Sequence, residues 1–378
     1  MKNPYLTDFK TARHTLSALL QEPFYVMFPN GLTATSDATT TKQVFCSTLI
    51  PFLHEFGYRG NFLYVPSLGE ERVIIHADET TGEIVLAEGF SSKVTSGTTF
   101  EIHGISVNVK LNALNSAIRQ SFPYYYTTDT LDIAIPKYQS VIVDKIPSTW
   151  ERVIQAYVEP YTRYMHGYFV TDSATTTTIT VSGAGWDTDY YEGWEVGVIT
   201  GDQEGTVVEV ASNTADTLTL STALSSALSV GDEFVLKGPL DGDVSLQSAW
   251  NEWYWLTVDT GNNRVYLPNR LLGEYGRTLR LVGIKRPTEF PSNPMDDTAT
   301  TECNGDYLAY QAANIVNIRY VARSADVTTE PYQWLGRWDA QEAERILHRT
   351  AIPLPPQTIF RGHSKGRPSV SPNPFSEW

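Results

Sequence analysis

Residues 196–238 read VGVITGDQEGTVVEVASNTADTLTLSTALSSALSVGDEFVLKG, and this stretch decides the fold because it occurs twice. Residues 62–104 can be laid on it without a gap, at an offset of 134 residues. Threonine-rich runs precede the two copies, at 38–41 and 174–178. The matched pairs include Val73 with Val207, Ile84 with Leu218, Leu86 with Leu220, Phe90 with Leu224, Gly97 with Gly231, Phe100 with Phe234 and Gly104 with Gly238. A period of this length is not a solenoid repeat, so the sequence predicts one small β-domain duplicated within a different host.

Each copy contains two strand-like segments around a polar turn. In the first copy the turn is DETTG at 78–82, and in the second it is SNTAD at 212–216. Turn residues of these types between β-branched segments are typical of hairpins. The paired glycines predict equivalent tight backbone turns, because glycine adopts positive φ without steric cost. We therefore expect one strand order in both segments.

The host combines helices and short strands. Four stretches have helical spacing of apolar residues, and N-capping residues at 7, 106 and 304 mark three of their starts. Strand-like runs lie on both sides of the second copy, so that copy reads as an insertion between strands of one sheet. The helical stretches are 7–21, 106–122, 304–320 and 329–349, and the strand-like runs are 140–145, 152–158, 252–258, 264–267 and 278–284.

These patterns predict an α+β fold. It would combine a discontinuous helical bundle, a small antiparallel sheet, two duplicated β-barrel or sandwich-like modules, and an extended C-terminal arm. The predicted parts are an N-terminal bundle helix (1–31), β-module 1 (32–104), a bundle helix with sheet strands (105–170), β-module 2 (171–238), sheet strands with a terminal helix pair (239–350), and the arm (351–378).

Composition narrows the functional classes. The net charge is −15 although only 19% of the residues are charged, so the surface is acidic. Such a chain is a poor candidate for wrapping nucleic acid, which depends on Lys and Arg. It could still line a conduit through which DNA passes, because like charges repel. Cys46 and Cys303 are expected to be free buried thiols. There is no apolar run of about 18 residues and no signal-like start, so we expect no membrane association and no export signal.

The sequence contains no catalytic signature, and we expect a protein that is not an enzyme. The seven histidines are scattered and no phosphate-binding glycine loop is present, so no catalytic residue, cofactor or metal is predicted. The acidic pairs Glu70-Glu71 and Asp296-Asp297 could in principle hydrolyse a glycosidic bond. Solvated turn residues are the simpler interpretation, and it also covers the calcium-like Asp241-Gly242-Asp243.

Aromatic residues gather in two places. Trp250, Trp253, Tyr254 and Trp255 lie within six residues, and module 2 carries Trp186, Tyr190, Tyr191 and Trp194. Three interpretations stay open: ordinary core, anchors of a protein interface, or a platform that stacks on sugars.

Beyond Ala351 the composition changes. Six prolines exclude a helix, and the segment is basic within an acidic protein. We expect this arm to dock in an extended form on another protein, since its prolines lower the entropy lost on ordering. Its partner-binding residues would be Arg361, Lys365 and Arg367 toward an acidic neighbour, with Phe375 and Trp378 as apolar anchors.

Together these features resemble virion proteins of tailed bacteriophages. TTTTITV at 175–181, WEVGVIT at 194–200 and VGDEFVL at 230–236 resemble β-modules of such proteins. The host, with LNALNSAIR at 111–119 and YLAYQAA at 307–313, resembles head-to-tail connector (adaptor, or head-completion) proteins.

That resemblance implies a function. Such proteins are non-enzymatic and form a ring, usually of twelve subunits, beneath the portal protein. The implied partners are the portal, tail or neck proteins and double-stranded DNA in the lumen, and the implied place is the virion neck after assembly in the host cytoplasm. The arm would then reach into the portal. Two alternatives remain: a receptor- or glycan-binding tail protein, and a tail-associated glycosidase.

Overall fold

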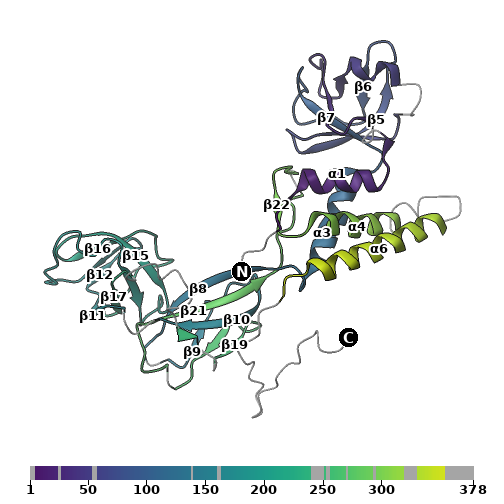
Figure 1. Cartoon of the computed structure of the whole chain (residues 1–378). Coiled ribbons are helices and arrows are strands. Elements are labelled where there is room, and N and C mark those ends of the chain that lie inside the picture. The colour runs from purple at the N-terminus through teal and green to yellow at the C-terminus, as the bar shows by residue number, and fades with distance from the viewer. Residues whose placement is uncertain are drawn as a thin grey trace. The chain divides into compact units, whose positions relative to one another are not determined.

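The computed structural model describes residues 5–23, 27–52, 58–137, 139–159, 163–239, 251–252, 256–269, 271–292, 295–318 and 330–353. The chain divides into two compact units (Figure 1). Unit 1 comprises Met1–Thr127 with Arg286–Leu354, and unit 2 comprises Thr128–Lys285 with Pro355–Trp378.

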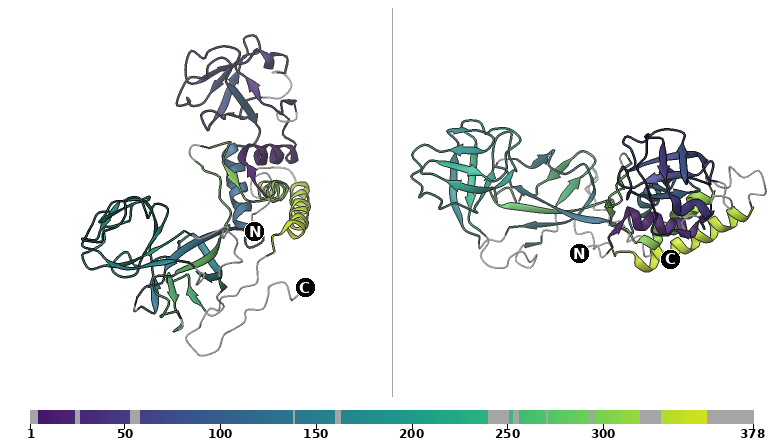
Figure 2. Two further views of the ribbon diagram at one scale, coloured as in Figure 1. Left: turned by 60° about the vertical axis from the view of Figure 1, so that its left-hand side comes forward. Right: turned by 90° about the horizontal axis from the view of Figure 1, so that it is seen from above.

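The expected fold class, a helical bundle with a small sheet, is wrong. Strands account for 32% of the structure and helices for 23%. The described strands form five sheets, of two, four, seven, three and six strands, in which every recorded pairing is antiparallel. Helical spacing is confined to a few stretches, and strands take up a larger share than helices. Sheets, including a half-barrel sheet, therefore dominate the architecture (Figure 2).

Module 1 is the six-stranded sheet of unit 1. Its strand order is β2-β7-β4-β5-β6-β3. The strands are β2 (Leu32–Thr33), β3 (Gln43–Phe45), β4 (Phe62–Val65), β5 (Glu70–Ala77), β6 (Glu83–Leu86) and β7 (Thr99–His103), with a short 3-10 helix at Ser47–Phe52. The sheet encloses one apolar core that includes Leu63, Ile84 and Phe100.

The helices of unit 1 share a second core. They are α1 (Phe9–Leu19), α3 (Val107–Ser121), α4 (Gly305–Val316) and α6 (Glu330–Thr350), joined by the short pair β1 (Thr7–Asp8) and β22 (Thr300–Thr301). Ser106 and Asn304 cap α3 and α4 as the sequence predicts. The cap of α1 is Asp8, one residue after the predicted Thr7, because the Asp8 carboxylate accepts the N–H of Thr11.

Unit 2 contains module 2, a seven-stranded sheet of order β11-β17-β14-β15-β16-β13-β12. Its strands are β11 (Met165–Val170), β12 (Ser173–Ala174), β13 (Thr178–Thr180), β14 (Glu195–Val198), β15 (Val207–Asn213), β16 (Thr217–Leu220) and β17 (Glu233–Lys237). The same unit holds the host strands β8 (Thr127–Ala134), β9 (Val141–Val143), β10 (Trp150–Val158), β18 (Asn251–Glu252), β19 (Thr257–Asp259), β20 (Arg264–Tyr266) and β21 (Thr278–Lys285). Strands β10 and β21 pair directly, and module 2 lies between them in sequence.

The two modules have the same strand order. β2, β7, β4, β5, β6 and β3 correspond in turn to β11, β17, β14, β15, β16 and β13. Both sheets are irregular at the same place, between Ile74 and His76 in β5 and between Val210 and Ser212 in β15. A shared bulge is strong evidence of one fold, since bulges fix the local twist and register.

The ungapped offset of 134 holds for only part of the module. The offset of 134 is right for β6 with β16 and for β7 with β17. The pairing registers, however, match Leu63 with Val196, an offset of 133, and Ile74 with Val210, an offset of 136. The connection before β5 is 66–69, whereas that before β15 is 199–206, and the next turn is 78–82 in one copy and 214–216 in the other. These length differences nearly cancel, so the ungapped match hides them.

Candidate functional sites at the two β-modules

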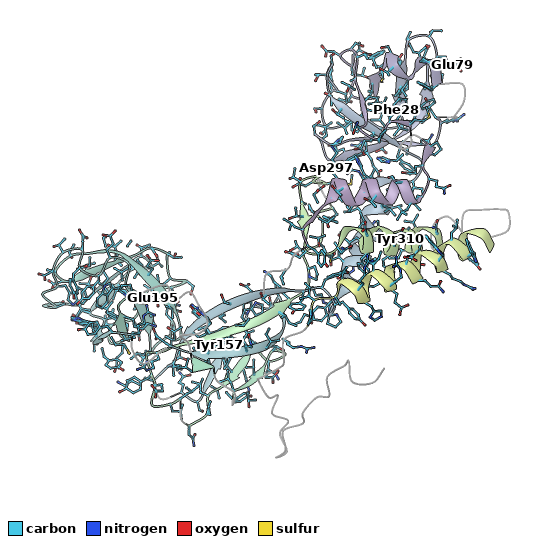
Figure 3. The ribbon with its side chains drawn as sticks, viewed as in Figure 1. Phe28, Glu79, Tyr157, Glu195, Asp297 and Tyr310 are labelled. Carbon is cyan, nitrogen blue, oxygen red and sulfur yellow. The ribbon has the colours of Figure 1, made fainter. Side chains whose placement is uncertain are left out.

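The first candidate site is a buried charge network around Arg13, which reaches from α1 to module 1. Its guanidinium donates to Glu101 on β7 at 3.0 and 3.2 Å and to Asp297 at 2.5 and 3.0 Å. The Tyr64 hydroxyl donates to Asp297 at 2.9 Å, and the Tyr64 ring lies 4.6 Å from the guanidinium carbon (Asp297 is labelled in Figure 3). Bidentate pairs of this kind fix the relative orientation of the two side chains and also add binding energy.

Lys110 on α3 continues this network. Its side chain is fully buried, and its ammonium donates to Glu22, to Ser17 Oγ at 2.8 Å and to His103 Nδ1 at 2.9 Å. Because an ammonium can only donate, Nδ1 of His103 accepts, which leaves its Nε2–H to donate to Glu101 at 2.9 Å. α1, α3 and β7 are thereby tied together through buried polar contacts.

Two carboxylates of this network, Glu22 and Glu101, are held in the charged form. Burial alone would raise the pKa of Glu22, but Lys110 and His103 outweigh it and lower that pKa to about 2. Burial is likewise overcome at Glu101, where hydrogen bonds from His103 and His14 hold the pKa well below its usual range. A general acid needs a pKa near the working pH, so these carboxylates are suited to structural pairing.

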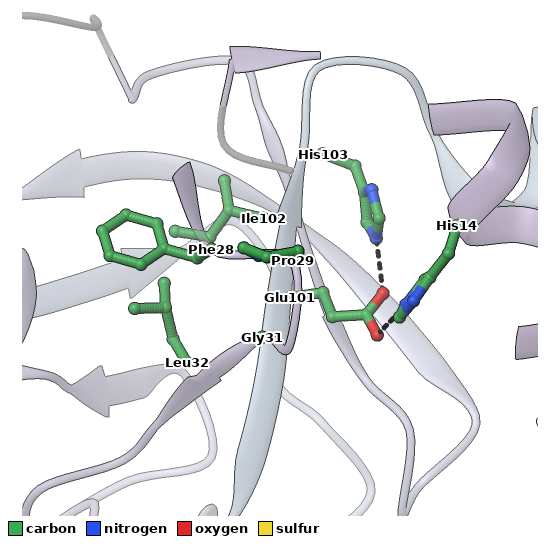
Figure 4. A pocket seen from close by; sticks show the side chains of 8 residues that line it. All are labelled: His14, Phe28, Pro29, Gly31, Leu32, Glu101, Ile102 and His103. Carbon is green, nitrogen blue, oxygen red and sulfur yellow. Dashed lines mark hydrogen bonds and ion pairs between the residues drawn. The ribbon is translucent and has the colours of Figure 1, made fainter. Parts of the chain in front are cut away.

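A small cavity lies beside the network (Figure 4). It is lined in part by Phe28 and Leu32 on one side and by His14, Glu101 and His103 on the other, and the Glu101 carboxylate lies between the two imidazoles. Its volume of about 10 Å³ has room for about one water molecule. It cannot hold a substrate.

The second candidate site is a buried charge network at the base of module 2. Arg163 Nη1 donates to Glu159 at 2.5 Å and to Glu195 at 2.9 Å (Glu195 is labelled in Figure 3). The buried Lys237 ammonium, at the end of β17, donates to the Thr278 hydroxyl and lies 3.5 Å from Glu159. Burial lowers the pKa of Lys237, and the charges of Glu159 and Glu195 oppose that shift.

The two networks occupy corresponding positions. His103 is opposite Phe62 in module 1, and Lys237 is opposite Glu195 in module 2, so both lie at the last residue of the same strand. In the first network two cations face Glu22, Glu101 and Asp297, and in the second two cations face two carboxylates. The position is shared, but the residues that fill it differ.

The third candidate site is aromatic. Trp186, Tyr191 and Trp194 are buried in the core of module 2, whereas Tyr190 is exposed. The ring of Tyr190 lies 5.7 Å from that of Trp194, and Tyr164, which the sequence did not single out, lies 5.9 Å from the same ring. The core interpretation is therefore correct for three of the four aromatic residues singled out in module 2.

The acidic pairs of the sequence do not form catalytic dyads. Glu70 pairs with Arg72, and Glu71 accepts hydrogen bonds at the start of α3, beside an open hollow of about 270 Å³. Asp296 binds Thr298 and Asp297 binds Arg13. Within the described part of the chain, no group of three His, Cys, Asp or Glu side chains could hold a metal ion, and Cys46 and Cys303 are free and buried.

Several predicted residues lie outside the described part of the chain. They are the arm residues Arg361, Lys365, Arg367, Phe375 and Trp378, the aromatic residues Trp250, Trp253, Tyr254 and Trp255, and Asp241 to Asp243.

Comparison with known proteins gives no family. No protein-family model matches the sequence, and no curated protein matches it at a significant level. Among the described residues, no helix has both the length and the apolar character needed to cross a membrane.

Proposed function

We propose that this chain is a non-enzymatic structural protein of a tailed-phage virion. In this role it is a head-to-tail adaptor at the neck, which forms a ring between the portal and the tail and leaves a channel for DNA. The observation that carries the proposal is the repeated module. One strand order occurs twice, and in both copies the end of the last strand lies in a buried charge network. Two firmly anchored copies of one module suit a protein that presents repeated contacts to its neighbours.

The charge distribution also supports a DNA conduit. Eleven acidic residues lie between 171 and 238, and Lys237 is the one lysine or arginine in that range. A surface of this kind does not retain phosphate backbones, because binding them requires cations that release counterions. In a channel it allows DNA to pass without sticking.

The test is to purify the full chain, measure its mass in solution and image it by negative-stain electron microscopy. We expect closed rings of about twelve subunits, as in connector proteins. We also expect a stable complex with the portal protein when purified portal is added. A compact trimer that binds bacterial glycans and ignores the portal would contradict the adaptor and support a receptor-binding tail protein.

A further inference from the structure

Module 2 carries an aromatic patch in which exposed rings gather around one tryptophan of its core. We define the aromatic patch as Tyr164, His166, Tyr190 and Trp194. Tyr164 is 61% exposed and Tyr190 is 53% exposed, and their ring centroids lie 5.9 and 5.7 Å from that of the buried Trp194. The His166 ring joins them, 6.1 Å from that of Trp194. Tyrosine and tryptophan at a surface are typical anchors of a protein interface.

The loop that carries Tyr190 is held in place by one buried amide. Asn213 donates through Nδ2 to the carbonyl of Asp187 at 2.8 Å and accepts the N–H of Tyr191 through Oδ1 at 2.8 Å. Its own carbonyl accepts the N–H of Asp189 at 2.9 Å. The loop is therefore pre-organised, which lowers the entropy that binding would otherwise cost.

Three exposed carboxylates flank the aromatic patch on the same loop. They are Asp187, Asp189 and Glu192. Within the ranges that the structure describes, no cation forms an ion pair with any of them. Ring faces beside unpaired carboxylates favour Lys and Arg side chains, through ionic and cation–π attraction together.

A segment with the complementary chemistry is present in the same sequence. Residues 354–378 contain Arg361, His363, Lys365 and Arg367, against one acidic residue, Glu377. The same segment carries the apolar residues Phe375 and Trp378. Fully extended, its 25 residues span roughly 80 Å, enough to reach a neighbouring subunit.

We propose that the aromatic patch of module 2 is the docking surface for residues 354–378 of a second copy of this chain. The inference rests on the proposed ring, because a ring of identical subunits repeats one head-to-tail contact until it closes. The Lys and Arg side chains lie against the carboxylates and ring faces of the patch, and Phe375 and Trp378 bury apolar surface beside them. The segment thereby links one subunit to the next, whereas the resemblance to connector proteins implies that it reaches into the portal.

The test uses the full chain with a photo-crosslinking amino acid, p-benzoylphenylalanine, in place of Tyr190. An equal mixture of ¹⁴N- and ¹⁵N-labelled protein is irradiated and the cross-linked peptides are identified by mass spectrometry. We expect cross-links to residues 354–378 that join one light and one heavy peptide. The same amino acid in place of Ile75, an exposed residue of module 1, is the matched control and should give none.

Charge reversal gives the second arm of the test. Asp187→Lys, Asp189→Lys and Glu192→Lys together should reduce the cross-link yield at least about tenfold, which corresponds to about 1.4 kcal/mol. Adding Arg361→Glu, Lys365→Glu and Arg367→Glu should restore it. Rescue by the second reversal cannot be explained by misfolding of module 2.

Three outcomes would overturn the inference. The first is that no cross-link to residues 354–378 forms, and the second is that cross-links form within one copy alone. The third is that a bacterial glycan, and not residues 354–378, covers position 190. Rings that form without these cross-links reject the docking and leave the adaptor standing. Cross-links between copies in a preparation without rings support the docking and count against the adaptor.

Discussion

Module 1 and module 2 share a strand order and differ in what surrounds it. Apolar positions correspond strand by strand, with Leu63 and Val196, Ile84 and Leu218, and Phe100 and Phe234 all buried. The connection before β5 in module 1, by contrast, is 66–69, whereas the connection before β15 in module 2 is 199–206. The core and the bulge therefore specify the fold, while loop length is free to change.

The two modules differ most in the polar residues of the charge networks at the end of β7 and β17. Module 1 places His103 and Glu101 against Arg13 and Lys110, whereas module 2 places Lys237 against Glu159 and Arg163. Burying charge is unfavourable unless the groups are paired, so each network had to be completed as a set. A fold tolerates different residues at this position as long as each network pairs its charges.

The largest expected effect comes from removing one cation from each network. Arg13→Met removes the cation that pairs with Asp297 and should lower the free energy of unfolding of unit 1 by about 3–5 kcal/mol. Lys237→Met should cost unit 2 only about 1–3 kcal/mol, because Arg163 still pairs with Glu159 and Glu195. Hydrogen exchange read by mass spectrometry reports the two units separately. Equal losses in the two variants would show that the networks are interchangeable and contradict the asymmetry argued above.

Much of this fold can be read from the sequence, because its signals are local. The hairpin turns, the caps at Ser106 and Asn304 and the shared strand order all follow from short-range patterns. The overall class could not be read, since the share of sheet depends on many two- and three-residue strands that leave no periodic pattern. The ungapped match at 134 residues also failed for part of the module, because one loop is longer and the next turn is shorter in module 2, and these length differences nearly cancel.

The charge networks were missed although the sequence holds a weak signal. Arg13 lies on the apolar face of α1, four residues after Phe9 and three before Leu16, and Lys110 lies in the same way between Val107 and Leu114. A cation on an apolar helical face suggests a buried ion pair. Its partners cannot be named from the sequence, since Glu101 and Asp297 are 88 and 284 residues from Arg13.

A smaller effect is expected from acid. The pKa of Glu22 falls from 4.5 to about 2 on folding, so its contribution is complete above pH 4.5 and is lost as the pH falls to about 2. Over that window we expect Glu22 alone to account for about 3 kcal/mol of the stability lost around α1 and β7, with a further share from Glu101, whose pKa is also lowered. Glu22→Gln should remove its own share and leave that of Glu101, whereas Glu192→Gln, at an exposed residue of module 2, should leave the dependence unchanged. Hydrogen exchange of peptides from α1 and β7, corrected for the intrinsic effect of pH, measures it.

The smallest effect concerns the glycines that the two modules share. Gly97 and Gly231 have φ of +86° and +94°, and each donates its N–H at 2.9 Å to a corresponding carbonyl, of Ala34 and Thr171. The positive φ expected at Gly104 and Gly238 is not found. A side chain at Gly97 or Gly231 would meet no atom within 4 Å, so the backbone conformation alone should set the penalty.

Gly97→Ala and Gly231→Ala should therefore each cost about 1–2 kcal/mol, by the same amount within error. Gly104→Ala and Gly238→Ala serve as matched controls, because a methyl group at either position keeps ordinary contact distances and no left-handed backbone is required. Urea unfolding followed by hydrogen exchange in the affected module measures all four. If Gly97→Ala destabilises module 1 while Gly231→Ala leaves module 2 unchanged, the two turns are not equivalent. The correspondence of the modules would then hold for their strands but not for the loop that precedes their last strand.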